Sequence, residues 1–422
     1  MQNRKQPPSP IAYLVLRAVS LATLLVAGGD AQAAVDTYPA WTFGGYGTLS
    51  VVHSDYDQAD FTSSILKETG AGATRSYAAN IESRLGAQVG VKLDKKWSAV
   101  VQVGLEQRFD GSYRPQVEWA NVKYQATPDL ALRVGRIALP IFLAADYRKI
   151  GYAYPWARTP NEVYGGVPIT NSDGADLAYR WQASGVKYTT EAFYGRTSVH
   201  LTDSTGVKAR GLGGVTHTAE WGAATIRVSA FTAVLNVNIV RKLFDGYRMF
   251  GPDGVAIAEK YDVIDRRTTG FALGVNYDPG KWFVMAEGGR INTHSFLGDT
   301  VGMYTSAGYR AGDFTSYILY ARNKPQDPTS DPGLPLTGLP PQYATAAAQL
   351  NRGLGQLLKS TSSQSNIGVG VRWDFRSGMA LKLQYERLTP REGTRGTLIN
   401  LEPGFVSGRP VNVTSAVLDF VF

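Results

Sequence analysis

The chain has 422 residues, with 46 glycines, 23 tyrosines, 8 tryptophans and no cysteine. The absence of cysteine excludes disulfide bonds, thiolate metal sites and thiol redox chemistry. The formal net charge is +8, but basic residues are scattered among acidic ones without a basic run, which excludes nucleic acid as a partner. A composition rich in glycine and aromatic residues is typical of a β protein.

The first 33 residues predict a secretory signal peptide. Arg4 and Lys5 precede an apolar run over residues 18–26, and the small residues at 31 and 33 predict cleavage after Ala33. A retained N-terminal anchor is the alternative, although the run is short for a membrane span. Removal of residues 1–33 takes away three basic residues and one acidic residue, so the charge falls from +8 to +6 for the mature chain, residues 34–422.

From Trp41 onward, apolar and polar residues alternate in segments of about ten residues, the pattern of β-strands. In residues 97–108, for example, Trp97, Val101 and Leu105 share one face while Gln102 lies on the other. No long uncharged apolar stretch follows the signal, which excludes a transmembrane helix. A closed barrel is the other structure that spans a membrane.

The connections between these segments alternate between short and long. Compact turn signals lie at residues 94–96, 127–129, 182–185, 222–223, 278–281, 310–313 and 376–378. Longer polar stretches lie at residues 54–78, 109–115, 138–174, 197–208, 236–266, 292–300, 323–363 and 388–410. Seven short turns and eight long loops connect sixteen strands, an even number that suits a bacterial barrel with short periplasmic turns and long extracellular loops. Eighteen strands remain open, because one long loop has room for another hairpin.

The stretch 323–363 contains the one segment with helical periodicity. Over residues 341–358, Ala347, Leu350, Leu354 and Leu358 recur at helical spacing. We therefore predict a short helix inside an extracellular loop, supported by the proline-rich segment that precedes it.

Aromatic residues gather at one end of the predicted hairpins and at the C-terminus. Trp97, Trp181, Trp221, Trp282 and Trp373 lie close to predicted periplasmic turns, where an interfacial aromatic belt is expected. Residues 415–422 alternate so that apolar side chains share a face up to Phe422. The ordinary alternative for the tryptophans is cross-strand packing, which does not explain why they recur at one end.

Several of these segments resemble the proteobacterial outer-membrane porin superfamily. The resemblance rests on the segment Thr-Phe-Gly-Gly-Tyr-Gly-Thr at 42–48, on Ser-Arg-Leu-Gly at 83–86, on Val-Gly-Arg at 134–136 and on the terminal Phe422. It implies an all-β, sixteen-stranded transmembrane antiparallel barrel that is usually trimeric, with a third outer loop that folds inward as a constriction. It also implies that Phe422 is an assembly signal for the barrel assembly machinery.

Residues 138–174 form the third long loop and are therefore expected to be the constriction loop. Its charged candidates include both signs, unlike the acidic loop of many general porins: Asp146, Arg148, Lys149, Arg158 and Glu162. Strand parity predicts basic pore-lining residues at Arg84, Arg108, Arg133, Arg180, Arg372 and Lys382. We expect Arg84, Arg108 and Arg133 to form a basic cluster opposite Asp146 and Glu162. The alternative is that these charges only solvate a wet interior.

An enzymatic barrel would need a histidine paired with a nucleophile or carboxylate. His53, His200, His217 and His294 show no such spacing, and none of them forms a metal-ligand pair. We therefore expect neither an enzyme nor a cofactor or metal. A plugged structural barrel is disfavoured by sixteen strands, which leave an aqueous channel.

The sequence as a whole predicts a channel in the cell outer membrane for passive diffusion of small hydrophilic solutes and ions, with a mild preference for anions. A substrate-specific channel for carboxylates or phosphate is the alternative. The expected partners are outer-membrane lipid and lipopolysaccharide, the barrel assembly machinery, periplasmic chaperones, and two further copies in a homotrimer.

Overall fold

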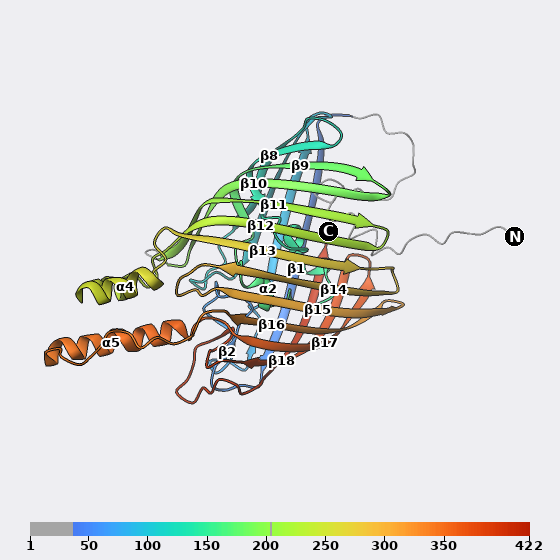
Figure 1. The fold of residues 1–422 in the computed structure, drawn as a ribbon. Helices are drawn as coiled ribbons and strands as arrows, with labels where there is room; N and C mark the ends of the chain where they lie inside the picture. The colour runs from blue at the N-terminus through green and yellow to red at the C-terminus, as the bar shows by residue number, and fades with distance from the viewer. Residues whose placement is uncertain (1–36, 203–204) are drawn as a thin grey trace.

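The computed structural model describes residues 37–202 and 205–422 and contains sixteen long antiparallel strands, each bonded to its neighbours in chain order (Figure 1). They are β1 (Ala40–Ser54), β5 (Arg84–Lys92), β6 (Trp97–Glu106), β7 (Gln116–Gln125), β8 (Leu130–Ala138), β9 (Asn171–Ala183), β10 (Val186–His200), β11 (Gly206–Trp221), β12 (Ala224–Val237), β13 (Arg266–Tyr277), β14 (Trp282–Asn292), β15 (Thr300–Ala311), β16 (Phe314–Pro325), β17 (Gln364–Arg376), β18 (Met379–Pro390) and β20 (Val411–Val421). The barrel closes where β1 pairs with both β5 and β20. The predicted barrel of sixteen strands is confirmed, and the predicted signal peptide lies outside the described residues.

The alternating sequence determines which face of each strand meets the membrane. Val101 on β6 is 48% exposed on the outside. The next residue, Gln102, is 5% exposed and donates to Gln88 of the neighbouring strand β5 on the lumen face. The C-terminal strand behaves in the same way, since Leu418 pairs in register with Leu49, which is exposed on the outer face of β1, while Asp419 is fully buried inside. Apolar residues outside and polar residues inside are what a membrane barrel requires.

All seven predicted turns connect adjacent strands, and they lie at the end opposite the long loops. Glycines with positive φ occupy five of them, at Gly185, Gly222, Gly280, Gly312 and Gly378, a backbone conformation that other residues adopt only with strain. The five tryptophans predicted to form a belt are all exposed and lie at this end of the strands: Trp97, Trp181, Trp221, Trp282 and Trp373. Trp181 stacks on Tyr188, with ring centroids 4.0 Å apart.

The long loops carry structure of their own. The predicted helix is confirmed as α5 (Pro341–Leu358), but the stretch 236–266 also forms two helices that the sequence analysis did not predict, α3 (Arg241–Arg248) and α4 (Gly251–Tyr261). Phe244 and Tyr247 of α3 pack with Leu354 of α5 in a small core of their own. In Figure 1, α4 and α5 project beyond the loop end of the barrel. Among the described helices, none has the length and hydropathy needed to cross a bilayer.

Short strands join the first and last loops. A small sheet contains β2 (Asp60–Phe61), β3 (Ala71–Gly72) and β19 (Leu398–Ile399), while β4 (Tyr77–Ala78) pairs with β1.

The third loop turns into the barrel. It covers residues 139–170 and contains two short 3-10 helices, η1 (Ala145–Tyr147) and η2 (Gly151–Ala153), and one helical turn, α2 (Asn161–Tyr164). Strand β9 begins at Asn171, so the loop ends slightly earlier than the predicted boundary at 174. Its side chains pack against the inner wall and form much of the largest buried apolar cluster. We call residues 139–170 the inward loop.

Candidate functional site: the lumen and its inward loop

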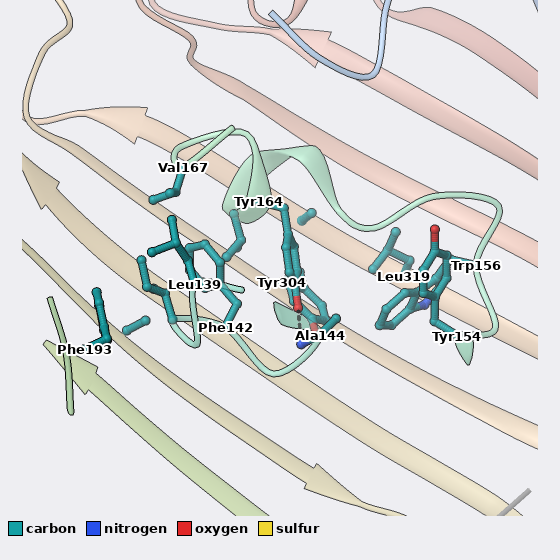
Figure 2. Packing of buried hydrophobic residues seen from close by; sticks show 14 of the residues in the cluster. Leu139, Phe142, Ala144, Tyr154, Trp156, Tyr164, Val167, Phe193, Tyr304 and Leu319 are labelled. Atoms are coloured by element: carbon teal, nitrogen blue, oxygen red, sulfur yellow. Dashed lines mark hydrogen bonds between the residues drawn. The ribbon is translucent and has the colours of Figure 1, made fainter. Parts of the chain in front are cut away.

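Apolar side chains hold the inward loop against one side of the lumen. Phe142, Tyr164 and Trp156 of the loop lie in one buried cluster with Tyr304 of β15 and Leu319 of β16. Figure 2 shows these side chains pointing from the loop toward the strands beneath it. The Trp156 indole donates to Ser306 Oγ over 2.9 Å, so the buried ring also has a polar partner.

Basic side chains of the same wall donate to carbonyl oxygens of the inward loop. Arg227 on β12 donates to Phe142 O over 2.7 Å, and Arg372 on β17 donates to Tyr152 O over 2.6 Å. Lys382 on β18 donates to three loop carbonyls over 2.7 to 2.9 Å and lies 2.8 Å from Asp419. We call this side, formed by β11–β18 and β20, the anchoring wall.

Arg372 and Lys382 therefore do not face the water-filled part of the lumen. Their strand parity is as predicted, but the loop covers them, and their exposed fractions are 6% and 0%. The prediction that Arg372 and Lys382 are free pore-lining charges is wrong, because the inward loop covers both side chains. A charge buried this deeply needs every available partner, and the loop carbonyls supply them.

Several charged residues of the inward loop also face the anchoring wall. Arg158 is 4% exposed, lies 2.8 Å from Glu82 and forms a second ion pair with Glu386. Glu162 accepts from Gln364 over 2.6 Å, while its other carboxyl oxygen has no hydrogen-bond partner in the structure. Burial raises the pKa of Glu162 above its ordinary value. Glu162 thus lies under the loop and not in the lumen opposite Arg84 and Arg133.

Arg148 and Lys149 leave the loop in different directions. Arg148 donates to the carbonyls of Val167 and Tyr164 and so connects the first half of the loop with its C-terminal part. Lys149 reaches across to the other side of the lumen, where its Nζ lies 2.7 Å from Glu106 Oε1 and 2.6 Å from Glu118 Oε1. This bridge connects the loop with β6 and β7.

We call the side formed by β5–β10 the open wall. Arg133 on β8 pairs with Asp176 on β9 at 2.8 Å and lies 3.9 Å from Glu191 on β10. Asp146 of the inward loop acts electrostatically on both Arg133 and Glu191 and has no ion pair within the described ranges. Asp146 therefore acts on Arg133 without an ion pair, in a mixed cluster of both signs, and its role opposite Arg133 stays a prediction.

The other two arginines of the predicted cluster lie elsewhere. Arg84 pairs with Glu82 at 3.0 Å, and strands β6 and β7 separate it from Arg133. Arg108 follows the end of β6 and belongs to the second loop, so it is not a strand residue of the wall. The structure thus does not bring Arg84, Arg108 and Arg133 together as one cluster.

A different set of basic residues follows the open wall toward the turn end. Lys123 on β7 lies directly opposite Arg133 in register. Lys92 on β5 lies two strands away from Lys123, because Ser98 of the intervening strand β6 pairs with both lysines. Arg180 on β9 is exposed and lies on the same face as Asp176. Lys92, Lys123 and Arg180 have no ion pair anywhere in residues 37–202 and 205–422. We call Lys92, Lys123, Arg133 and Arg180 the basic ladder.

Lys123 was not among the predicted pore-lining residues. The signal was present, since Lys123 stands between the outward residues Val122 and Tyr124. A β-bulge opposite Gln102 and Val103 shifts the alternation within β7, which obscured the parity of this strand in the sequence.

The comparisons with known proteins agree with this architecture. The family model described as Gram-negative porin matches residues 18–397. No curated protein matches the sequence.

Solved structures with the same fold have low sequence identity to the chain. The outer membrane channel DcaP of Acinetobacter baumannii is 11% identical with a TM-score of 0.55, covering 94% of this chain and 100% of that one. Salmonella typhi OmpF, solved with daunomycin, is 12% identical with a TM-score of 0.54, covering 91% and 98%. An anion-selective porin from Comamonas acidovorans is 12% identical with a TM-score of 0.50, covering 91% and 99%. With a family match over most of its length and a closed barrel around an inward loop, the chain belongs to the Gram-negative porins and is an outer-membrane diffusion channel, not an enzyme.

Proposed function

We propose that this porin favours small anions among the hydrophilic solutes that diffuse through it. The observation that carries the proposal is the basic ladder, whose four side chains lie on the lumen face of β5, β7, β8 and β9. Three of the four have no carboxylate partner in the described part of the chain.

Unpaired cations act on passing ions more strongly than paired ones. In a narrow lumen the effective dielectric constant is lower than in bulk water, so a fixed charge has a larger effect on a nearby ion. Screening over about 8 Å at physiological salt confines that effect to the neighbourhood of the charge. Asp176 pairs with Arg133 and offsets part of its charge, whereas Lys92, Lys123 and Arg180 have no ion pair in the described part of the chain. The free carboxylate of Asp146 opposes them and limits the preference.

Ion selectivity in planar bilayers tests the proposal. Protein carrying Lys123→Gln and Arg180→Gln should show a reversal potential in a KCl gradient that has moved toward cations. Arg352→Gln, on the exposed face of α5 outside the barrel, is the control and should leave the reversal potential where it was. An unchanged potential in the double variant would refute the proposal. Saturation of anion flux with carboxylate or phosphate would favour the substrate-specific alternative.

The three arginines predicted from the sequence provide a second comparison. Replacing Arg84, Arg108 and Arg133 together by Ser should also shift the reversal potential toward cations. The shift should be smaller than in the ladder variant, because Arg84 and Arg133 already have carboxylate partners. A larger shift than in the ladder variant would mean that the basic ladder is not the main determinant of ion selectivity.

We further propose that the mature protein, residues 34–422, assembles as a homotrimer in contact with lipopolysaccharide after periplasmic chaperones deliver it to the barrel assembly machinery. Strands β5–β8 have 9 or 10 residues, whereas β9–β12 have 13 to 16. The barrel wall is therefore shorter on the side formed by β5–β8. Its outer face exposes Leu85, Val89 and Val101, which suits contact with a second copy. Chemical crosslinking in membranes should yield a trimer.

The C-terminal strand supports the proposed delivery. Phe422 is 66% exposed on the outer face and therefore available for recognition. Deletion of Phe422 should lower the yield of membrane-inserted barrel and leave the protein with periplasmic chaperones. An unchanged yield would remove this residue from the assembly signal.

A further inference from the structure

One tryptophan takes no part in the features of the fold described above. Five of the 8 tryptophans form the belt at the turn end, a sixth, Trp41, is exposed on the outer face of β1, and a seventh, Trp156, holds the inward loop. The eighth is Trp119 on β7. Within residues 37–202 and 205–422 it belongs to none of the buried apolar clusters, and its indole N–H has no hydrogen-bond partner.

A β-bulge determines which way Trp119 points. Trp119 lies directly opposite Gln102, whose side chain is on the lumen face, and the register of β7 shifts beside this pair. Glu118 stands in the bulge and also points inward, since its carboxylate binds Lys149 of the inward loop. Bulges redirect side chains and are frequent beside functional sites. The bulge thus places an aromatic ring on the lumen face of the open wall.

Trp119 lies at the level where the inward loop narrows the lumen. Its neighbour Glu118 accepts from Lys149 of the loop, with 2.6 Å between Oε1 and Nζ, so the loop is joined to β7 at the residue next to Trp119. This bridge leaves Glu118 only 3% exposed, whereas Trp119 is half-buried. Part of the indole ring is therefore accessible to a solute that passes beside the bridge.

Two cations of the basic ladder follow Trp119 on the same face. Lys123 is four residues further along β7, about 13 Å away and on the same side of the strand. Arg133 of β8 lies directly opposite Lys123. Asn121, between Trp119 and Lys123, lies against the wall, because its amide donates to a backbone carbonyl of β8 over 2.9 Å. The indole ring and the two cations therefore face the same stretch of lumen.

We propose that Trp119 and the basic ladder together form a subsite for small aromatic anions such as aromatic carboxylates. The ring of the solute packs on the indole of Trp119, while its carboxylate is attracted to Lys123 and Arg133. Aromatic rings gain from offset-stacked or edge-to-face contact beyond the apolar area that they bury. Conduction needs contacts that favour entry but still permit release, and a single ring contact in a wet lumen meets that need. The inference rests on the proposed anion preference and extends it from the charge of the solute to its shape.

Reversal potentials in planar bilayers, with KCl on one side and a potassium carboxylate on the other, test the subsite. Benzoate and cyclohexanecarboxylate are the two probes, since they have the same charge and similar size but only benzoate has a planar aromatic ring. We expect the wild-type protein to be about two- to tenfold more permeable to benzoate than to cyclohexanecarboxylate, the range that one aromatic contact contributes.

Substitutions of Trp119 separate ring contact from pore width. Trp119→Leu should bring the permeability ratio of the two carboxylates close to one, whereas Trp119→Phe should keep most of it, although both changes widen the lumen. Trp221→Leu, at a belt position 70% exposed on the outer face, is the matched control and should keep the wild-type ratio. An unchanged ratio in Trp119→Leu would overturn the proposal. Equal ratios in Trp119→Leu and Trp119→Phe would overturn it as well, because the ring would then act only through its size.

The potential in a KCl gradient distinguishes this subsite from the proposed anion preference. Trp119→Leu should leave that potential unchanged, because the cations of the ladder remain. Lys123→Gln with Arg180→Gln should lower the permeability to both carboxylates and keep their ratio above one. Chloride preference without a ratio that depends on Trp119 would remove the subsite and leave the proposed function. A ratio that depends on Trp119 in a channel without chloride preference would instead refute the proposed function alone.

Discussion

Two sides of one lumen use the same kind of residue in different ways. On the anchoring wall, Arg372 and Lys382 are buried and donate to carbonyl oxygens of the inward loop. On the open wall, Lys123 and Arg180 have the same charge and the same inward parity but no ion pair in the part of the chain that the structure describes. The difference arises because the loop lies on one side and leaves the other uncovered.

This contrast shows that inward parity alone does not make a residue pore-lining. A cation covered by the loop has lost its water and contributes to loop position, and its partners neutralise its field. A cation left in water contributes little to stability but acts on passing ions. Variants on the anchoring wall should therefore change the stability of the fold, whereas variants on the open wall should change ion selectivity.

The largest effect is expected for Lys382→Met on the anchoring wall. It leaves Asp419 buried without its cation, and removal of one partner of a buried pair costs about 3 to 5 kcal/mol. Urea unfolding in lipid vesicles would measure this loss. Lys123→Met is the control and should change the unfolding free energy by about 0.5 kcal/mol or less. Similar losses in both variants would contradict the distinction between the walls.

The outer face of the open wall should give the next largest effect. Val101→Arg places a charge on the apolar outer face of the barrel, near the middle of β6, and should cost about 2 to 4 kcal/mol. Gln102→Arg, one residue along, faces the lumen and should cost much less in the same unfolding assay. Equal costs would mean that the two faces are not assigned correctly.

The bridge between the loop and the open wall should give an intermediate effect. Lys149→Met removes charge-assisted hydrogen bonds to Glu106 and Glu118 and should cost about 1.5 to 3 kcal/mol. Because this bridge ties the loop to β6 and β7, its loss should also increase single-channel conductance. A variant with unchanged conductance would show that the bridge does not limit the opening.

The smallest effects are expected for the two carboxylates of the inward loop. Asp146→Asn should shift the reversal potential slightly toward anions, whereas Glu162→Gln should not, because Glu162 is 3% exposed beneath the loop.

The raised pKa of Glu162 means that the folded state favours the protonated carboxyl. Ionisation of Glu162 therefore lowers the stability of the fold as the pH rises above the ordinary pKa of a glutamate. Glu162→Gln should therefore keep or increase the unfolding free energy at neutral pH and leave it unchanged at acidic pH. A cation-directed shift for Asp146→Asn would contradict the arrangement.

The sequence by itself determined the barrel, because alternation along each strand is a local property. Side chains alternate between the two faces of a strand, so the neighbours Val101 and Gln102 must lie on opposite faces. Each turn is likewise marked by the residues within it. The helix at Pro341–Leu358 was predictable for the same reason, since its apolar residues repeat at helical spacing. Helices α3 and α4 were missed because glycine and proline interrupt their sequence, and packing against α5 stabilises them.

Only the tertiary structure decided which charges reach water. Arg372, Lys382 and Arg180 share an inward parity, yet the long-range path of residues 139–170 buries the first two and leaves the third exposed. The same path turned Glu162 toward Gln364 and Lys149 toward Glu106 and Glu118. Such contacts join residues far apart in the chain, and no periodicity within one segment encodes them. Strand faces follow from local sterics, whereas the position of a loop follows from the sum of its contacts with many strands.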